Sequence, residues 1–189
     1  MDQFTPLTGR LLVAMPGIGD PRFEHAVILI CAHAPDHAMG LRLDHPAPMV
    51  DLKAVLAKLE VPAPSSAHGV PVMIGGPVER ERGFVLHTDD WSAGEASIPF
   101  GEALAMTATR EALVAMVDPE AGPRRATLLL GYAGWGDGQL EDELAENVWL
   151  VSDPDSDLIF DRDHETKWTR ALARIGVDAA RLSGQAGRA

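Results

Sequence analysis

Apolar residues along this chain come in short runs that glycine, proline and charged residues separate. Runs of this kind, rich in branched residues and bounded by turn signals, are typical of β-strands. The run Ala26–Ala32 is apolar at every position, so we expect a central strand that is buried on both faces. A polar loop, His33–Met39, is expected to follow it. The other predicted strands are Gly9–Ala14, Gly40–Leu43, Val70–Ile74, Gly83–His87, Ala96–Pro99, Arg125–Tyr132, Val148–Ser152 and Leu158–Phe160.

Four segments are predicted to be helical because their apolar residues recur on one face. In the last of them, Asp163 can cap the start of the helix and Gly176 can close its end. The four segments are Asp51–Leu59, the residues from the N-cap Thr109 to Val117, Gln139–Glu146 and Glu165–Ile175.

The length and composition agree with one globular domain. The chain has 189 residues, of which 46% are hydrophobic and 23% are charged, and this is enough to bury a core. Strands outnumber helices and only partly alternate with them, which favours a mixed α+β fold over a regular doubly wound sheet. We expect a single domain over residues 1–189, with residues 1–6 and 183–189 as loosely ordered tails.

The charge balance argues against one class of partner. The chain has 16 basic and 28 acidic residues and a net charge of −12. DNA affinity depends on basic residues that neutralise phosphates, so we expect a protein partner rather than nucleic acid. The N-terminus lacks the regions of a signal peptide, and no apolar run is long enough to span a bilayer. We therefore expect a cytoplasmic protein that does not bind a membrane, and its single cysteine fits a reducing compartment.

The stretch Leu128–Leu144 combines features that are common at binding sites. An apolar run leads into a glycine-rich bend, Gly131–Gly138, which opens into an acidic helix. Neither G-x-G-x-x-G nor a lysine-bearing phosphate loop is present, and the acids at the helix start would repel a phosphate. The bend is either a tight turn whose aromatic residues pack on the core, or a surface for a ligand or partner. The candidate residues of that surface are Tyr132, Gly134, Trp135, Gln139 and Glu143.

Cys31 lies near the end of the apolar strand, and strand periodicity puts it on the same face as His33, about 7 Å away at Cα. A neighbouring imidazole can lower the pKa of a thiol and create a nucleophile or a redox sensor. Free cysteine is, however, most often a small buried apolar residue. Both interpretations stay open. The reactive one predicts alkylation of Cys31 at pH 7 that slows in His33→Asn.

Two further segments carry residue types that bind ligands or metals. Arg82 and His87 bracket an apolar strand, and they either end a simple turn-and-strand unit or line a pocket. The acidic run from Asp153 resembles the first half of a calcium loop. Its sixth and twelfth positions are Leu158 and His164 rather than glycine and glutamate, so the match fails. We expect neither a metal nor a cofactor.

Several motifs follow one another in the order known from one family. They are LLVAMPGIGDPRFEHAVILICAH, the Met39-Gly40-Leu41 turn, GGPVERERGFVLH, LGYAGWGDGQLEDEL with Asn147 and Trp149, and the closing LSGQAGRA. Together they resemble the YqgE/AlgH family over nearly the whole chain. Each motif is modest by itself, but the ordered set is highly specific.

The resemblance implies a compact bacterial fold in which helices surround a bifurcated, partly barrel-like sheet. Family members are often labelled transcriptional regulators through a link to alginate production, and no enzymatic activity is established for the family as a class. Two positions depart from the family pattern: Asp44 stands where an asparagine is usual, and Arg42 replaces a typical apolar residue. The characteristic positions correspond here to Pro16, Asp20, Phe23, Cys31, His33, Gly40, Gly75, Gly76, Pro77, Arg82, Gly83, His87, Gly131, Tyr132, Gly134, Trp135, Gln139 and Glu143.

Three hypotheses for the function follow. The first is a non-enzymatic regulatory or adaptor protein that acts through protein contacts, with an indirect effect on transcription. The second is a small-molecule-responsive or redox-responsive protein that uses Cys31 near His33 or His87. The third is a DNA-binding regulator, which ranks last because no helix-turn-helix signal is evident and the charge is unfavourable. We favour the first hypothesis. The sequence does not indicate an oligomeric state.

Overall fold

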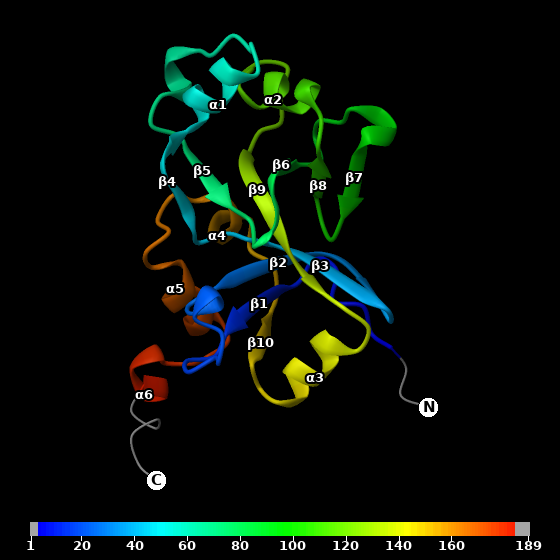
Figure 1. Cartoon of the computed structure of the whole chain (residues 1–189), viewed down its shortest axis with the longest axis vertical. Coiled ribbons are helices and arrows are strands. Elements are labelled where there is room, and N and C mark those ends of the chain that lie inside the picture. The colour runs from blue at the N-terminus through cyan, green and yellow to red at the C-terminus, as the bar shows by residue number, and fades with distance from the viewer. Residues whose placement is uncertain (1–3, 184–189) are drawn as a thin grey trace. The chain divides into compact units, whose positions relative to one another are not determined.

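The computed structural model describes residues 4–183 and forms two compact units. One unit is assembled from both ends of the chain, residues 1–44 and 134–189, and we call it the terminal unit. The other, residues 45–133, is the inserted unit. Figure 1 shows the elements of both units, coloured along the chain. Each unit combines strands with helices, so the α+β prediction is confirmed.

The terminal unit is built on an antiparallel sheet in the order β10-β1-β2-β3. Its pairing joins the two ends of the chain, because Leu12 lies opposite both Val151 and Ile28. The strands are β1 (Leu11–Ala14), β2 (Val27–Ala34), β3 (His37–Arg42) and β10 (Trp149–Ser152). The helices are α3 (Gln139–Ala145), α4 (Ser156–Phe160), α5 (Lys167–Arg174) and α6 (Ala179–Ser183), with a 3-10 turn, η1 (Pro21–Phe23).

β1 and β2 form the core of this sheet. All of β1 is fully buried, and so is the segment Val27–Ile30 of β2, which confirms the prediction of a central strand there. α5 packs on both strands through Ala171 and Leu172, and the Trp168 indole donates a hydrogen bond to the Ala14 carbonyl at 2.8 Å. Burial of this apolar surface is the main stabilising contribution within the unit.

The segment His33–Met39, predicted to be a polar loop, is a β-hairpin. β2 continues to Ala34, β3 begins at His37, and these two residues lie opposite each other. Only Pro35 and Asp36 form the turn between the strands. Because the hairpin tip is exposed, polar side chains are tolerated there, and the hydrophobic pattern gives no sign of the strands.

The inserted unit contains a mixed sheet in the order β7-β8-β6-β9-β5-β4. β5 and β9 are parallel, and the other neighbours are antiparallel. The strands are β4 (Pro46–Asp51), β5 (Pro71–Ile74), β6 (Val78–Thr88), β7 (Ser97–Phe100), β8 (Leu104–Thr107) and β9 (Ala126–Trp135), and the last two residues of β9 belong to the terminal unit. The helices are α1 (Leu52–Lys58) and α2 (Arg110–Met116), with 3-10 turns η2 (Ser65–Ala67) and η3 (Gly94–Ala96).

α1 and α2 lie next to each other in Figure 1 and share one apolar core with the sheet. The predicted N-cap Thr109 is confirmed, because its side chain accepts the Ala112 amide proton. Asp51, predicted as the first residue of a helix, is instead the N-cap of α1, and its side chain accepts the Ala54 amide proton. The core consists of Leu52, Leu56, Val61, Ala67, Val72, Val85, Ala112, Leu113 and Leu128.

The outer strands of this sheet, β4 and β7, both contain proline. Pro46 and Pro48 lie in β4, and Pro99 lies in β7. Proline has no amide proton to donate, so these edges are poor templates for pairing with another strand. β4 also bulges outward at Met49, which has a positive φ of 60° and a fully exposed side chain.

The prediction of a glycine-rich bend at Gly131–Gly138 is wrong for the first half of that segment. Gly131–Trp135 continues β9, and only residues 136–138 form the turn. Gly131 has a φ of +71°, and a Cβ at Gly76 would come within 2.0 Å of the Tyr132 carbonyl carbon. Glycine is therefore needed for a close approach of two backbones rather than for a loop.

Other segments also differ from the prediction. Leu158–Phe160, predicted as a strand, belongs to α4, whose N-cap Asp155 accepts the Leu158 amide proton at 2.9 Å. The strand β4 was not predicted because its two prolines are typical of turns. The strand β8 and the helix α6 were not predicted because each is too short to show a clear period. Gly176 closes α5 as expected, but the predicted cap at Asp163 is wrong. The N-cap of α5 is Thr166, which makes no side-chain cap, and Asp163 accepts a hydrogen bond from the Thr166 amide before the helix begins.

The predicted extent of the domain and its tails stays a prediction. Residues 1–3 and 184–189 lie outside the described residues. Across residues 4–183, no helix combines the length and apolar character that crossing a membrane requires.

Candidate functional site

Glu143 of α3 binds two tryptophan side chains at once. Its Oε2 accepts hydrogen bonds from Trp135 Nε1 at 2.8 Å and from Trp149 Nε1 at 2.6 Å. The two rings meet edge to face with centroids 6.1 Å apart, and both residues are buried, with exposed fractions of 6% and 3%. A carboxylate is a strong acceptor, so this indole clamp fixes α3 to the end of β9 and the start of β10.

Gln139 completes the clamp at the start of α3. Its Nε2 donates to Glu143 Oε1 at 2.8 Å, and its Oε1 accepts the Gly136 amide proton at 3.1 Å. The N-cap of α3 is Gly138, with a φ of 69°, and it has no side chain that could cap the helix. Gln139 therefore holds the turn from inside the helix.

His33 ties α3 to the β2–β3 hairpin. Its Nε2 lies 2.8 Å from Glu141 Oε1, and its Nδ1 accepts the Leu7 amide proton at 3.0 Å. The Phe4 ring meets the imidazole edge to face at 4.8 Å. Two carboxylates of one short helix, those of Glu141 and Glu143, are thus used to fix its position.

The remaining acidic side chains of this region face solvent. Asp137, Asp142 and Glu146 are exposed, and none of them has an ion-pair partner among residues 4–183. Unpaired carboxylates close together produce a negative potential over this surface, which extends about one Debye length, roughly 8 Å at physiological ionic strength. We call Asp137, Glu141, Asp142 and Glu146 the acidic α3 face.

Comparison with known proteins places the chain in a family. A model of the family described as AlgH-like matches residues 11–180. The chain belongs to the AlgH-like family. A UPF0301 protein of Caulobacter vibrioides is 55% identical over 97% of this chain and 94% of the relative, and one of Ruegeria pomeroyi is 47% identical over 97% and 99%. The resemblance inferred from the ordered motifs is confirmed.

Two solved structures have the same fold. The solution structure of the AlgH protein from Pseudomonas aeruginosa matches with a TM-score of 0.78 and 36% identity over the full length of both chains. The crystal structure of protein DIP2367 from Corynebacterium diphtheriae matches with a TM-score of 0.71 over 92% of this chain and 90% of that one. At 20% identity, the second likeness concerns the fold alone.

In this AlgH-like chain, Cys31 is set up as a core residue rather than as a nucleophile. Ile30 lies opposite Gly40 and Ala32 opposite Met39, so Cys31 is the extra residue of a β-bulge. Its thiol is buried, and burial raises the pKa of Cys31 far above its usual value. Both ring nitrogens of His33 bind other groups, so the imidazole is not available to activate the thiol.

The candidate residues of the inserted unit lie in separate environments. Arg82 is exposed, pairs with Glu79 at 3.4 Å and stacks over Phe84 at 5.1 Å. His87 is fully buried and lies five residues further along β6, about 16 Å away for an extended strand. The sequence hypothesis of one pocket lined by Arg82 and His87 is therefore not supported. Tyr132 packs edge to face on Phe84 with centroids 6.1 Å apart.

His87 has a complete set of hydrogen-bond partners. Its Nδ1 donates to the Thr88 carbonyl at 2.8 Å, and its Nε2 accepts a hydrogen bond from Thr107 Oγ1 at 2.8 Å. Thr107 is joined in turn to Ser97 Oγ at 2.7 Å. The chain of polar groups connects β6, β8 and β7 inside the unit, which is a structural role.

The two departures from the family pattern form one buried pair. Arg42 Nε and Nη2 bind the two carboxylate oxygens of Asp44, each at 2.9 Å. The remaining Arg42 donors bind the carbonyls of Arg22 and Glu24, and Asp44 also accepts the Val27 amide proton at 3.0 Å. The pair anchors the η1 segment to β3. Sequence reasoning found both residues but not their coupling.

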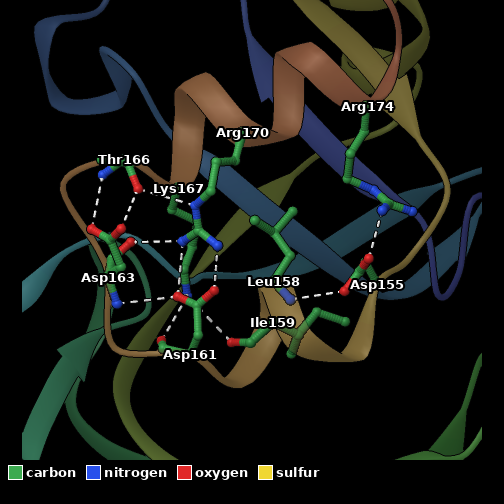
Figure 2. A network of polar contacts seen from close by, with 9 residues as sticks. All are labelled: Asp155, Leu158, Ile159, Asp161, Asp163, Thr166, Lys167, Arg170 and Arg174. Atoms are coloured by element: carbon green, nitrogen blue, oxygen red, sulfur yellow. Dashed lines mark hydrogen bonds and ion pairs between the residues drawn. The ribbon is translucent and has the colours of Figure 1, made fainter.

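A second polar network joins α4 to α5 (Figure 2). The Lys167 side chain is 1% exposed, and its ammonium donates to the carbonyls of Ile159 at 3.4 Å and Asp161 at 3.2 Å. These carbonyls lie at the end of α4, where a helix leaves acceptors unpaired. Burial lowers the pKa of Lys167, and the nearby Asp161 carboxylate opposes this shift.

Arg170 connects the other members of this network. It binds both oxygens of Asp161 and the Asp163 carbonyl, as Figure 2 shows. Burial alone would raise the pKa of Asp161, but the Arg170 hydrogen bond and the two nearby cations outweigh it and hold that pKa below its usual value. Arg174 pairs with Asp155, the N-cap of α4, at 2.5 Å. The network fixes α4 and α5 to each other.

His164 lies beside this network. Both of its ring nitrogens are buried without a hydrogen-bond partner among the residues that the structure describes. Burial lowers the pKa of His164, and the positive charge of Lys167 lowers it further. Sequence reasoning gave no role to Lys167 or to the contact of Trp149 with Glu143, because these contacts join one element to another and leave no periodic signal.

Proposed function

We propose that this chain is a non-enzymatic adaptor that binds a basic segment of a protein partner through the acidic α3 face, with an indirect effect on transcription. The observation that carries the proposal is the indole clamp on Glu143. The clamp gives a role to the sequence motif that most resembles a binding site. Trp135, Gln139 and Glu143 hold α3 in place.

An isolated helix as short as α3 is unstable in water. The clamp, the Gln139 contacts and the His33–Glu141 contact keep it in one position. A rigid surface loses little conformational entropy on binding, which favours recognition.

The charge of this surface favours a basic protein segment. Lysine and arginine side chains complement exposed carboxylates, and such complementarity speeds association and selects partners. A net charge of −12 opposes binding to the phosphate backbone of nucleic acid.

The proposal is tested by affinity capture from cytoplasm with three baits. They are the natural chain, Asp142→Lys/Glu146→Lys on the acidic α3 face, and Glu95→Lys/Glu102→Lys at exposed sites of the inserted unit. Each double variant replaces two negative charges by two positive ones, which changes the net charge from −12 to −8, so overall charge is matched. Each capture is repeated with nuclease and at high salt.

We expect a partner that survives nuclease, is lost at high salt, is lost with the α3 variant and is retained by the control variant. A partner that all three baits retain equally would place the interaction elsewhere. Loss of every partner after nuclease treatment would support the DNA-binding hypothesis instead.

A further inference from the structure

Met49 lies in the bulge of β4, on the outer strand of the inserted unit. Its side chain is fully exposed, whereas Met73 on the neighbouring strand β5 is 2% exposed and Met106 on β8 is 8% exposed. All three residues carry the same thioether and belong to the same sheet. The sulfur of Met49 is therefore open to dissolved reagents that close packing keeps away from Met73 and Met106.

The stability of the fold gives no reason for a methionine at this position. The φ of Met49 is 60°, in the left-handed region, which is unfavourable for a residue with a Cβ. Because the side chain lies in water, it buries no apolar surface that would offset this cost. What the residue adds to the surface is an exposed, polarisable sulfur atom.

The backbone around Met49 is accessible as well. Pro46 lies opposite Met73, and Asp51 lies opposite Pro71, so residues 47–50 are outside the ladder between β4 and β5. Among residues 4–183, β4 is also the last strand on its side of the sheet. An enzyme that acts on a methionine side chain can therefore approach this segment from the open side.

We propose that Met49 is a reversible oxidation site, where a peroxide converts the thioether into a sulfoxide and so makes an apolar point of the surface polar. A lone pair of Sδ attacks one peroxide oxygen, the S–O bond forms, the O–O bond breaks, and the other oxygen leaves as water. The sulfur loses two electrons, and the peroxide gains them. Methionine sulfoxide reductases return two electrons from a pair of thiols, which become a disulfide, and the sulfoxide oxygen leaves as water.

Oxidation at this position leaves the core intact. The sulfoxide replaces a side chain that already lies in water, so no buried contact is lost. On Met73, the same oxygen would place a polar group inside the core, which is costly. The surface of the inserted unit can thus change its polarity and recover it without unfolding. This chemistry does not depend on the partner of the acidic α3 face.

The test follows each methionine separately. The seven methionines lie on different tryptic peptides, and the peptide of residues 43–53 contains Met49 alone. The natural chain is treated with hydrogen peroxide at neutral pH, quenched at intervals and mapped by mass spectrometry. A blocked peptide with the sequence of residues 46–50 gives the rate for an open methionine. Met49→Leu keeps an apolar side chain of similar volume without the sulfur and serves as the control.

We expect Met49 to react as fast as the methionine of the blocked peptide, and about tenfold faster than Met73 and Met106, because oxidation follows exposure. Methionine sulfoxide reductases with a dithiol should return residues 43–53 of the folded chain to their starting mass. At the dose that oxidises Met49, the urea midpoint should shift no more in the natural chain than in Met49→Leu.

Three outcomes would overturn the proposal. They are a Met49 rate no higher than that of the buried methionines, a sulfoxide that the reductases do not reduce in the folded chain, and a urea midpoint that falls only when Met49 is present. The first two are measured on the natural chain, so they do not depend on the folding of a variant.

Discussion

The two units bury different kinds of polar group. The terminal unit buries charges: Lys167 and Arg42 are both inside it, and each is paired with an aspartate. In the part of the inserted unit that the structure describes, the buried polar residues are His87, Thr88 and Thr107, and no Asp, Glu, Lys or Arg is buried. Its surface is also more apolar, because it holds six of the seven large exposed hydrophobic residues found within residues 4–183, namely Met49, Val50, Leu59, Val78, Ile98 and Val114.

This difference shows that two ways of stabilising a sheet coexist in one chain. Buried ion pairs hold the terminal unit in one arrangement, although removing one partner leaves an unpaired charge. Apolar packing between helices and sheet holds the inserted unit, where the cost of a change depends on cavity volume. The stability of the terminal unit should therefore respond to charge and pH more than that of the inserted unit.

The largest effect is expected from Asp44→Ala. This change leaves the Arg42 guanidinium buried without its carboxylate and should lower the free energy of unfolding by about 3–5 kcal/mol, measured by urea denaturation. Arg42→Met/Asp44→Asn removes the charge pair as a whole and should lose less than the single variant. An equal or greater loss in the double variant would contradict the buried-charge explanation.

Leu56→Ala provides the counterpart in the inserted unit. Leu56 is fully buried in the shared core of α1, α2 and the sheet, so its truncation should cost about 2–5 kcal/mol in urea denaturation. The cost should be the same at pH 5 and pH 8, because no titrating group is removed. If the stability lost in Leu56→Ala differed between pH 5 and pH 8, the expected difference in pH response between the two units would be contradicted.

Glu143→Gln tests the indole clamp. The amide oxygen can still accept from the tryptophans, but the amide nitrogen then faces the donor of Gln139, so the free energy of unfolding should fall by about 1–3 kcal/mol. Tryptophan emission should shift because a neutral amide replaces the carboxylate beside the two indoles. Glu146→Gln, on the exposed side of the same helix, should stay within about 0.5 kcal/mol.

The smallest effect concerns pH and His164. Burial lowers the pKa of His164 in the folded state, so the unfolded state binds more protons at acidic pH. The free energy of unfolding should therefore fall as the pH drops below about 6.5, the usual pKa of histidine. His164→Gln should reduce this fall between pH 7 and pH 5, measured as the urea midpoint at each pH. An identical pH dependence in both proteins would show that His164 is not responsible.

The sequence predicted what depends on local patterns. The buried run in β2, the cap at Thr109 and the close of α5 at Gly176 are encoded within a few residues. The hairpin at His33–Met39 was missed because its exposed tip does not need apolar side chains.

The candidate site was predicted in part. Trp135, Gln139 and Glu143 do come together, since they are neighbours along β9 and α3. The roles of Trp149 and His33 could not be predicted, because their contacts with α3 depend on how separate strands pack against that helix. For Arg82 and His87, the sequence left open a turn-and-strand unit or a pocket. Both residues lie on the long strand β6, which keeps them apart.

The assembly of the terminal unit from both chain ends has a consequence for synthesis on the ribosome. β1 pairs with β10 across roughly 140 residues, so this sheet cannot be completed until the last third of the protein has emerged. The inserted unit is continuous and can begin to fold earlier. During that interval the apolar strands β1 and β2 lack the helix α5 that later covers them, and closing so long a loop is slow. The nascent chain is therefore most exposed to aggregation, and most dependent on chaperones, just before its C-terminal helices appear.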